Sequence, residues 1–459
     1  MAAIIPRVEL KESFFNQGIQ DTHFFNGRLL AAKDLETLQE ASRKRDVQLG
    51  QGLGAGIVYG FEVKLVANGA DGKPPVLAVA CGLAFNRAGQ AVALPVDAEV
   101  TLAKEKPITI PDRTGFEACP PDGSGGQPLP GKGAYLLVAR PTQGFTGLAP
   151  RRGFGQAAKV EGCDRDRLQE GVQFRLEELD LAQIPRLRAE TRTALAELMT
   201  RTDTPSLSRL RNWLAHICIG IEDWLAFLRD PLPDQLDPFF GSALRSEYHQ
   251  YGVVDALTGA GALDECDLPL ALVYWQAGGV HFVDMWSVRR RLAAPSLSIP
   301  WPQPLSARRL AEAEASFQQF QDHVNDLIKR LTITTLSAAH STEYFFYLPA
   351  AGILPLSQGA FRGFNAGVFF DQPHRPPEFI DGAALPALLQ ESWGYLPMPT
   401  NGDELVWVYR PWQNAKAIDD GENLQPYLVF TTGHMPPRSV ARFDVARWDY
   451  SHYQKGDCL

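Results

Sequence analysis

Two segments in the middle of the chain repeat apolar residues at intervals of three and four, the spacing of one helix face. The first segment carries Leu207, Leu210, Leu214, Ile217 and Ile221, and continues through Trp224 and Leu228. The second segment carries Leu310, Ala313, Phe317, Phe320, Val324, Leu327 and Leu331. Each segment therefore predicts a helix of about three heptads.

Both apolar stripes need a partner surface, and two arrangements meet this need. The helices can pack as neighbours of a bundle within one chain, or they can associate with other copies of the chain. The residues that flank the later stripe, among them Glu314, Gln321 and Arg330, lack complementary charge pairs. This disfavours an isolated two-stranded coiled coil, and Phe317 and Phe320 need more space than a helix dimer offers. The pattern favours a bundle or the centre of a trimer.

The first third of the chain is dominated by strand patterns. Residues that alternate over 57–65, 76–85 and 91–96, separated by the turn signals NGADGK and NRAGQ, predict a β-meander. Further strands are predicted over 134–140 and 172–176, and the segment 31–49 has the spacing of a helix with one modest apolar face. We therefore expect a β-rich domain with an inserted helix.

Strand patterns return later in the chain. The run LPLALVYWQAGGVHF predicts a β-hairpin near residues 268–288, and EYFFYLP, AGVFF, ELVWVYR, PYLVFTT and ARFDVARWDY predict C-terminal strands around a short helix in GAALPALLQES. The expected fold class is α+β and multi-domain. It comprises an N-terminal β-sandwich-like docking domain (1–182), a central helical bundle with the hairpin (183–337) and a mostly β C-terminal domain (338–459).

Composition narrows the classes of partner. The net charge of -9 argues against a surface built for nucleic acid, so we expect no nucleic-acid partner. The six cysteines are scattered without a C-x-x-C pair, which favours a reducing compartment. No secretory signal and no apolar run of about 18 residues or more is found, so we expect a cytoplasmic product.

The stretch QLGQGLGAGIVYGFEV, residues 48–63, raises the question of a phosphate-binding loop. Such loops follow a strand and open a helix, so that free N–H groups point at the phosphate. Here the glycines follow a helix and lead into a strand, and the helix would present its carbonyl end. Gly50 instead suits a helix C-cap. The stretch is therefore interpreted as a connector.

Other catalytic and metal-binding motifs do not emerge from the sequence. It contains no G-x-S-x-G elbow, no H-E-x-x-H helix and no acidic EF-hand loop. We expect no catalytic residues, no cofactor, no metal site and a protein that is not an enzyme.

The N-terminal run nevertheless resembles a family. FFNGRLLAAKDL, then GLGAGIVYGFEV, then FNRAGQAVALPV is similar to the opening of bacterial proteins tied to phage-tail-like contractile injection systems. Asn86 departs from that pattern, which has an acidic residue there. The matching residues are Phe25, Gly27, Leu29, Leu30, Asp34, Gly54, Gly56, Val58, Gly60, Glu62 and Val63.

The order of regions is also remotely similar to the baseplate adaptor subunit of type VI secretion systems, which is a trimer. The resemblance implies a structural baseplate or tail-tip adaptor, assembled in the cytoplasm into a phage-tail-like particle or virion. Its implied partners are other baseplate or tail subunits, further copies of itself in a trimer, and a membrane anchor, fibre or cell surface at the C-terminal domain.

A second hypothesis comes from the aromatic and acidic residues near the C-terminus. Trp407 and Trp412, with the acidic turn Asp419, Asp420 and Glu422, are compatible with a tail protein that binds or cleaves carbohydrate. The same acidic residues are equally typical of an exposed turn.

Overall fold

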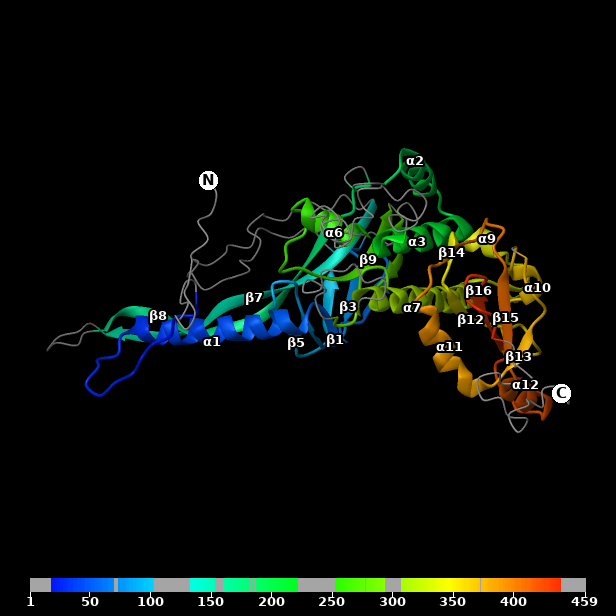
Figure 1. Ribbon diagram of the computed structural model, residues 1–459. Coiled ribbons are helices and arrows are strands. Elements are labelled where there is room, and N and C mark those ends of the chain that lie inside the picture. Colours follow the sequence, from blue (N-terminus) through cyan, green and yellow to red (C-terminus); the bar gives the residue numbers. More distant parts are fainter. Residues whose placement is uncertain are drawn as a thin grey trace, which may run out of the picture.

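The computed structural model has an α+β, multi-domain fold. It describes residues 18–69, 73–102, 133–152, 160–181, 184, 187–221, 252–276, 278–293, 307–371 and 373–438. No helix within these ranges is both long enough and apolar enough to cross a membrane. The molecule is elongated, with a projection at the N-terminal side and the C-terminal region at the opposite end (Figure 1).

A four-stranded sheet lies at the centre of the N-terminal side. Its order is β10 (Gly279–Asp284), β9 (Leu268–Gln276), β7 (Gly133–Arg152) and β8 (Val160–Glu178), with antiparallel neighbours. Alternate residues of β7 serve two different cores, because successive strand side chains point to opposite faces. Leu136 and Val138 lie in one core, and Leu137 and Ala139 in the other.

Two small sheets cover one face of this central sheet. They have the orders β1 (Gly56–Gly60), β4 (Gly82–Phe85), β5 (Ala91–Leu94), and β2 (Val63–Ala67), β3 (Val76–Val79), β6 (Ala98–Thr101). Leu77, Val79 and Val92 pack with Leu137 of β7 in the shared core. The predicted meander is thus confirmed as antiparallel strands.

Helices cover the other face of the sheet. They are α2 (Ala189–Leu198), α3 (Thr204–Ile219) and α6 (Gly252–Gly259). Asp203 caps α3 by accepting a hydrogen bond from the backbone N–H of Ser206 at 3.0 Å, and Gly220 ends the helix in the left-handed conformation. The later part of the first predicted helix, at Trp224 and Leu228, lies outside the described residues.

The C-terminal region is built on α7 (Ala307–Arg330) and a second sheet. The sheet has the order β12 (Ala351–Pro355), β16 (Tyr427–Thr432), β15 (Val406–Pro411) and β13 (Glu378–Ile380). Phe320 of α7 packs on Phe430 of β16, and α11 (Leu385–Ser392) contributes Leu388 to a smaller core with Val429. The shorter elements are α8 (Ile333–Ser337), α9 (Ser341–Tyr344), β11 (Tyr347–Leu348), α10 (Ala366–Phe369), η3 (Gly382–Ala384), β14 (Met398–Pro399) and α12 (Trp412–Asp419).

Several predicted elements differ from the observed ones in place or type. The hairpin predicted in the helical region exists as β9–β10, but β9 pairs with β7 and so belongs to the N-terminal sheet. The segment AGVFF was predicted as a strand and forms α10, because Asn365 caps it through the N–H of Gly367. ARFDVARWDY lies outside the described residues.

The two apolar stripes are buried within the chain, but in different cores. Leu210, Leu214, Ile217 and Ile221 belong to the core on the helix-covered face of the central sheet, and Leu207 packs against it. Phe320, Val324, Leu327 and Leu331 belong to the core under the C-terminal sheet. Leu310 is half-buried, and Phe317 lies in a groove between α7 and the segment 392–397. The stripes therefore do not pack against each other.

Helices α3 and α7 meet instead through a buried polar interface. Arg211 donates to the Asp284 carboxylate at 2.6 Å, and Gln319 donates to the same oxygen at 3.0 Å. The other Asp284 oxygen accepts from the backbone N–H and the hydroxyl of Ser287. Arg211 also reaches Asp326 at 3.2 Å. Because Arg211 of α3 and Asp284 of β10 both belong to the N-terminal half, the desolvated ion pair lies within that half, and Gln319 and Asp326 of α7 join the C-terminal half to it.

Two histidines complete this polar interface. His216 donates from Nδ1 to the carbonyl of Asn212 at 2.8 Å. The Ser208 hydroxyl donates to the carbonyl of Tyr344 at 2.9 Å, so His323 Nε2 donates to the Ser208 oxygen at 2.6 Å. This serine and histidine are both buried and their protons are committed, which gives them a structural role.

We expect Asp284→Asn to destabilise the protein by about 3–5 kcal/mol, because Arg211 would keep a buried charge without its anion. Denaturant titration at neutral pH measures this loss. The matched control is Asp326→Asn, since Asp326 is the half-buried second partner of Arg211, and its cost should stay below about 1 kcal/mol. Equal losses in both variants would contradict the central role of Asp284.

Acid should weaken the same interface. Burial lowers the pKa of His216 to about 4 from its ordinary 6.5, and it also lowers the pKa of His323. The stability contributed by neutral His216 is therefore complete above about pH 6.5 and lost as the pH falls toward 4, with a slope near 1.4 kcal/mol per pH unit.

Unfolding free energies measured across this range test the expectation. His216→Gln should lower the unfolding free energy at pH 7 but make it depend less steeply on pH. The difference between the wild-type and variant curves isolates His216 from other titrating groups. Parallel curves for the two proteins would rule out its titration.

Candidate docking surface

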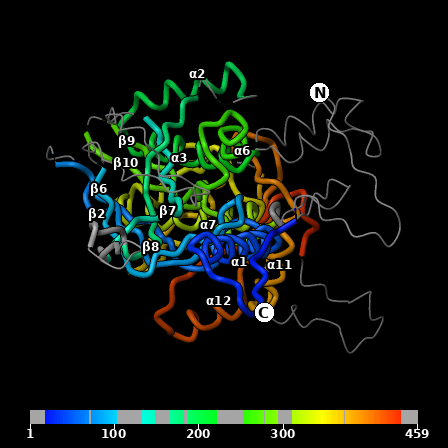
Figure 2. The backbone as a smooth tube through the Cα atoms, turned by 90° about the vertical axis from the view of Figure 1, so that its left-hand side faces the viewer, coloured from blue at the N-terminus to red at the C-terminus, as the bar shows by residue number. Residues whose placement is uncertain are grey.

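The projecting part of the molecule carries the first part of the family motif, from Phe25 to Asp34. Helix α1 (Ala32–Leu53) extends away from the body, and in the perpendicular view it lies in front of it (Figure 2). The helix expected to be inserted in the β-rich domain therefore projects from it. Only Ala41 and Gly50 of its 22 residues are buried.

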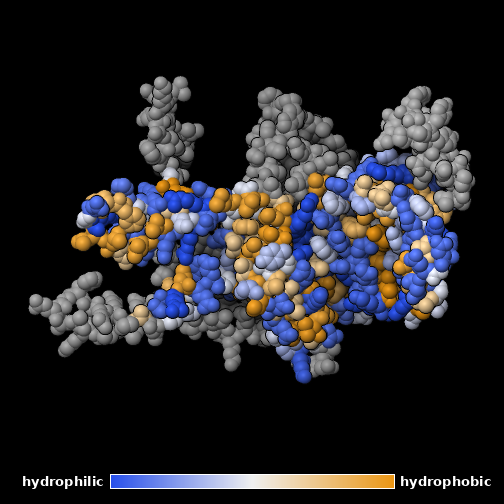
Figure 3. Space-filling view, turned by 90° about the horizontal axis from the view of Figure 1, so that it is seen from below, coloured by the Kyte–Doolittle hydropathy of each residue, from blue (hydrophilic) through white to orange (hydrophobic). Residues whose placement is uncertain are grey.

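The loop before α1 exposes apolar motif residues. Phe25 is 61% exposed, Leu29 92% and Leu30 57%. Apolar side chains are also visible along the projecting part of the space-filling view (Figure 3). Because such exposure of large apolar side chains is typical of interaction sites, this loop is the best candidate for a docking surface.

Asp34 fixes the geometry of this loop. Its carboxylate accepts a hydrogen bond from the backbone N–H of Ala31 at 2.9 Å and pairs with Arg28. The Ala31 hydrogen bond, supported by Arg28, lowers the pKa of Asp34. Gly27 adopts a φ of 89°, which allows the turn that precedes Arg28. The motif residues of the loop therefore position the exposed ones.

The motif glycines form the corner where α1 meets the body. Helix α1 continues past Gly50, the predicted cap, and ends at Gly54, whose N–H donates to the Gly50 carbonyl. Gly50 is instead a contact point, because a Cβ there would overlap the Gly89 carbonyl. Gly54, Gly56 and Gly60 have φ values of 96°, 140° and 70°, in the region that favours glycine.

Close backbone approaches explain two of these glycines. A Cβ on Gly56 would overlap the carbonyl group of Arg291, and one on Gly60 would overlap that of Cys81. Glu62 lies 3.5 Å from Arg289, which also donates to the Gly60 carbonyl. The glycine stretch is therefore a structural connector, as the order of helix and strand predicts.

The described residues hold no group of three or more His, Cys, Asp or Glu side chains placed for a metal ion. Cys266 is disulfide-bonded, which the scatter of cysteines did not predict, whereas Cys81 and Cys218 are free thiols.

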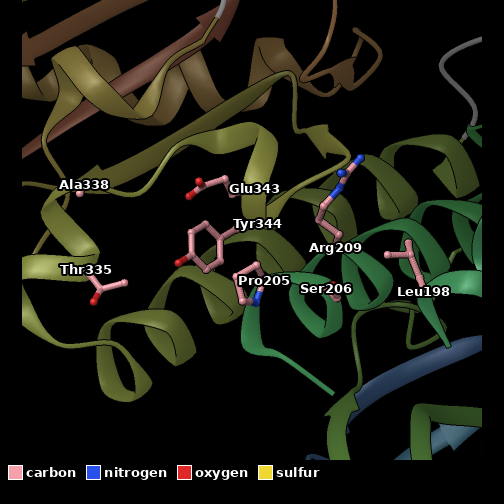
Figure 4. Close-up of a pocket in the computed structure, with 8 residues that line it drawn as sticks. All are labelled: Leu198, Pro205, Ser206, Arg209, Thr335, Ala338, Glu343 and Tyr344. Carbon is pink, nitrogen blue, oxygen red and sulfur yellow. The ribbon is translucent and has the colours of Figure 1, made fainter. Parts of the chain in front are cut away.

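A separate pocket of about 500 Å³ lies between α3 and the α8–α9 segment (Figure 4). Arg209 lies over the ring of Phe346 at 5.5 Å, and Glu343 accepts from the backbone N–H of His340 at 3.5 Å. The pocket lies away from the motif residues. Its lining consists of Leu198, Pro205, Ser206, Arg209, Thr335, Ala338, Glu343 and Tyr344.

The carbohydrate candidates do not gather into one face of exposed rings. Trp407 is half-buried on β15, with Arg375 over its ring at 5.5 Å, and Trp412 is half-buried at the start of α12. Asp419, Asp420 and Glu422 are exposed in the turn that ends α12, where the Glu422 N–H donates to Ala417. This turn needs no ligand to explain its residues.

No protein-family model matches the chain, and no curated protein matches it by sequence.

We expect Gly60→Ala to cost more than about 2 kcal/mol, because both the positive φ and the Cys81 carbonyl oppose a Cβ. The matched control is Gly52→Ala within α1, where a Cβ meets open space, and it should gain up to about 1 kcal/mol. Thermal or denaturant unfolding measures both. A neutral Gly60→Ala would contradict the proposed role of the corner.

Proposed function

We propose that this protein is a structural subunit of a phage-tail-like contractile injection particle, located in the baseplate or tail tip. The observation that carries the proposal is that the motif residues fall into two groups with different structural roles. Those with a backbone role, such as Gly56 and Gly60, build the root of the projection, whereas Leu29 and Leu30 are left exposed near its end. A motif of this kind suits a surface that docks on another subunit.

The proposed role is that of an adaptor that catalyses no reaction. In this role the N-terminal loop docks on other baseplate or tail subunits, and the C-terminal region binds a membrane anchor, fibre or cell surface. The C-terminal region lies at the opposite end of the molecule from the projection (Figure 1), which leaves both surfaces accessible at once. Assembly takes place in the cytoplasm. Most of the described stripe residues on α3 and α7 are buried in the chain's own cores, so the proposed trimer would use surfaces besides these stripes.

Particle incorporation tests the proposal. In cells that carry the gene, the protein should co-sediment with contractile particles, identified by their sheath and tube in electron micrographs and by mass spectrometry. Leu29→Asp should lower the amount in particles at least about tenfold, because a charge replaces an apolar docking contact.

The matched control is Leu424→Asp, which alters an exposed leucine far along the chain and should leave incorporation unchanged. Recovery of the wild-type protein only as free subunits, or binding to a glycan array in place of particles, would overturn the proposal.

A further inference from the structure

Helix α1 carries a leucine stripe that the described part of the chain leaves exposed. Leu35, Leu38, Leu49 and Leu53 are separated by three, eleven and four residues, which places them on one side of a helix with 3.6 residues per turn. Their exposed fractions are 50%, 37%, 68% and 51%. We call these four residues the leucine stripe.

This helix lacks the packing that normally stabilises a helix in water. Isolated helices are marginal in water, and most helical stability in proteins comes from packing of an apolar face. Helix α1 touches the body near Gly50, which lies against Gly89, and Gln51, which donates to the Ala88 carbonyl at 3.3 Å. Its leucine stripe therefore needs a partner surface.

The charges of α1 indicate what that partner is. Residues 32–42 hold Lys33 against Asp34, Glu36 and Glu40, a net charge of -2. Residues 43–53 hold Arg43, Lys44 and Arg45 against Asp46, a net charge of +2. Arg28 pairs with Asp34, and Asp21 pairs with Arg45. When these two partners are counted, the net charge of the first half of the helix is -1 and that of the second half is +1.

The helix dipole does not account for this separation of negative and positive charge along α1. It favours cations within the last turn of a helix, and the last turn of α1 contains none. The cations Arg43 to Arg45 lie in the middle of the helix. An antiparallel copy of α1 would match each half with a half of opposite charge, whereas a parallel copy would align like charges.

We infer that two copies of this chain pair through their α1 helices in an antiparallel arrangement. The two-fold symmetric register brings Leu38 of one copy opposite Leu49 of the other, and Leu35 next to Leu53. The helix is about 33 Å long. Since each helix joins its body at the C-terminal end, an antiparallel pair places the two bodies at opposite ends.

Solution mass tests the pairing on the full chain. We expect the chain to dimerise with a dissociation constant below about 100 μM. Leu38→Glu should raise this constant at least about hundredfold, because symmetry places the substitution in the interface twice. Leu424→Glu alters an exposed leucine outside the projection and should leave the dimer unchanged. A monomer up to about 100 μM, or equal weakening by both variants, would overturn the inference.

Disulfide trapping tests the orientation. Cys81→Ser removes the exposed free thiol of the described residues, and in this background chains with Leu38→Cys should cross-link to chains with Leu49→Cys. Neither variant should cross-link efficiently to itself. Cross-links of each variant only to itself would indicate parallel helices and overturn the antiparallel arrangement.

This pairing does not depend on the proposed particle function, and the two can fail separately. Leu29→Asp should impair particle incorporation and leave the solution mass unchanged, because Leu29 precedes the helix and lies outside the leucine stripe.

Discussion

The buried ion pair between Arg211 and Asp284 is the interaction on which the architecture depends. Arg211 on α3 and Asp284 on β10 both belong to the N-terminal half, and this pair binds Asp326 and Gln319 of α7, whose apolar face belongs to the C-terminal core. A slip of one helix would leave charged and amide groups buried without partners, which is far more costly than a shift between two apolar faces. Polar contacts thus fix the relative placement of the two cores.

The body and its projection differ in whether their apolar faces are covered. In the body, the longer helices α3 and α7 and the two four-stranded sheets have covered apolar faces, whereas α1 and the loop before it present leucine and phenylalanine to solvent. The corner between them relies on backbone geometry at Gly56 and Gly60. Surfaces on the projection can therefore serve binding, because the fold of the body does not use them.

Much of the fold followed from periodicity in the sequence, including the meander, the β9–β10 hairpin, α3, α7 and the strands β15 and β16. The pairing of β9 with β7 did not, because strand order depends on contacts across more than 130 residues. The polar interface was missed although its signal was present. Ser208, Asn212 and His216 recur every four residues on α3, and Ser316, Gln319 and His323 recur at intervals of three and four on α7. Such spacing marks a polar face on each helix, but it does not specify which distant residues that face contacts.

The attachment of α1 also defines a route for mechanical load. The residues after the corner join a distant segment, since Ile57 donates to the Arg290 carbonyl at 2.8 Å and Leu292 donates back to Ile57 at 2.9 Å. Arg291 in that segment forms an ion pair with Glu314 of α7 at 2.7 Å. A pull on α1 would therefore be carried by backbone hydrogen bonds to the segment 290–292, and from there into α7 by the Arg291–Glu314 ion pair. Tension at one end of the molecule would be felt at the other without passing through the hydrophobic cores.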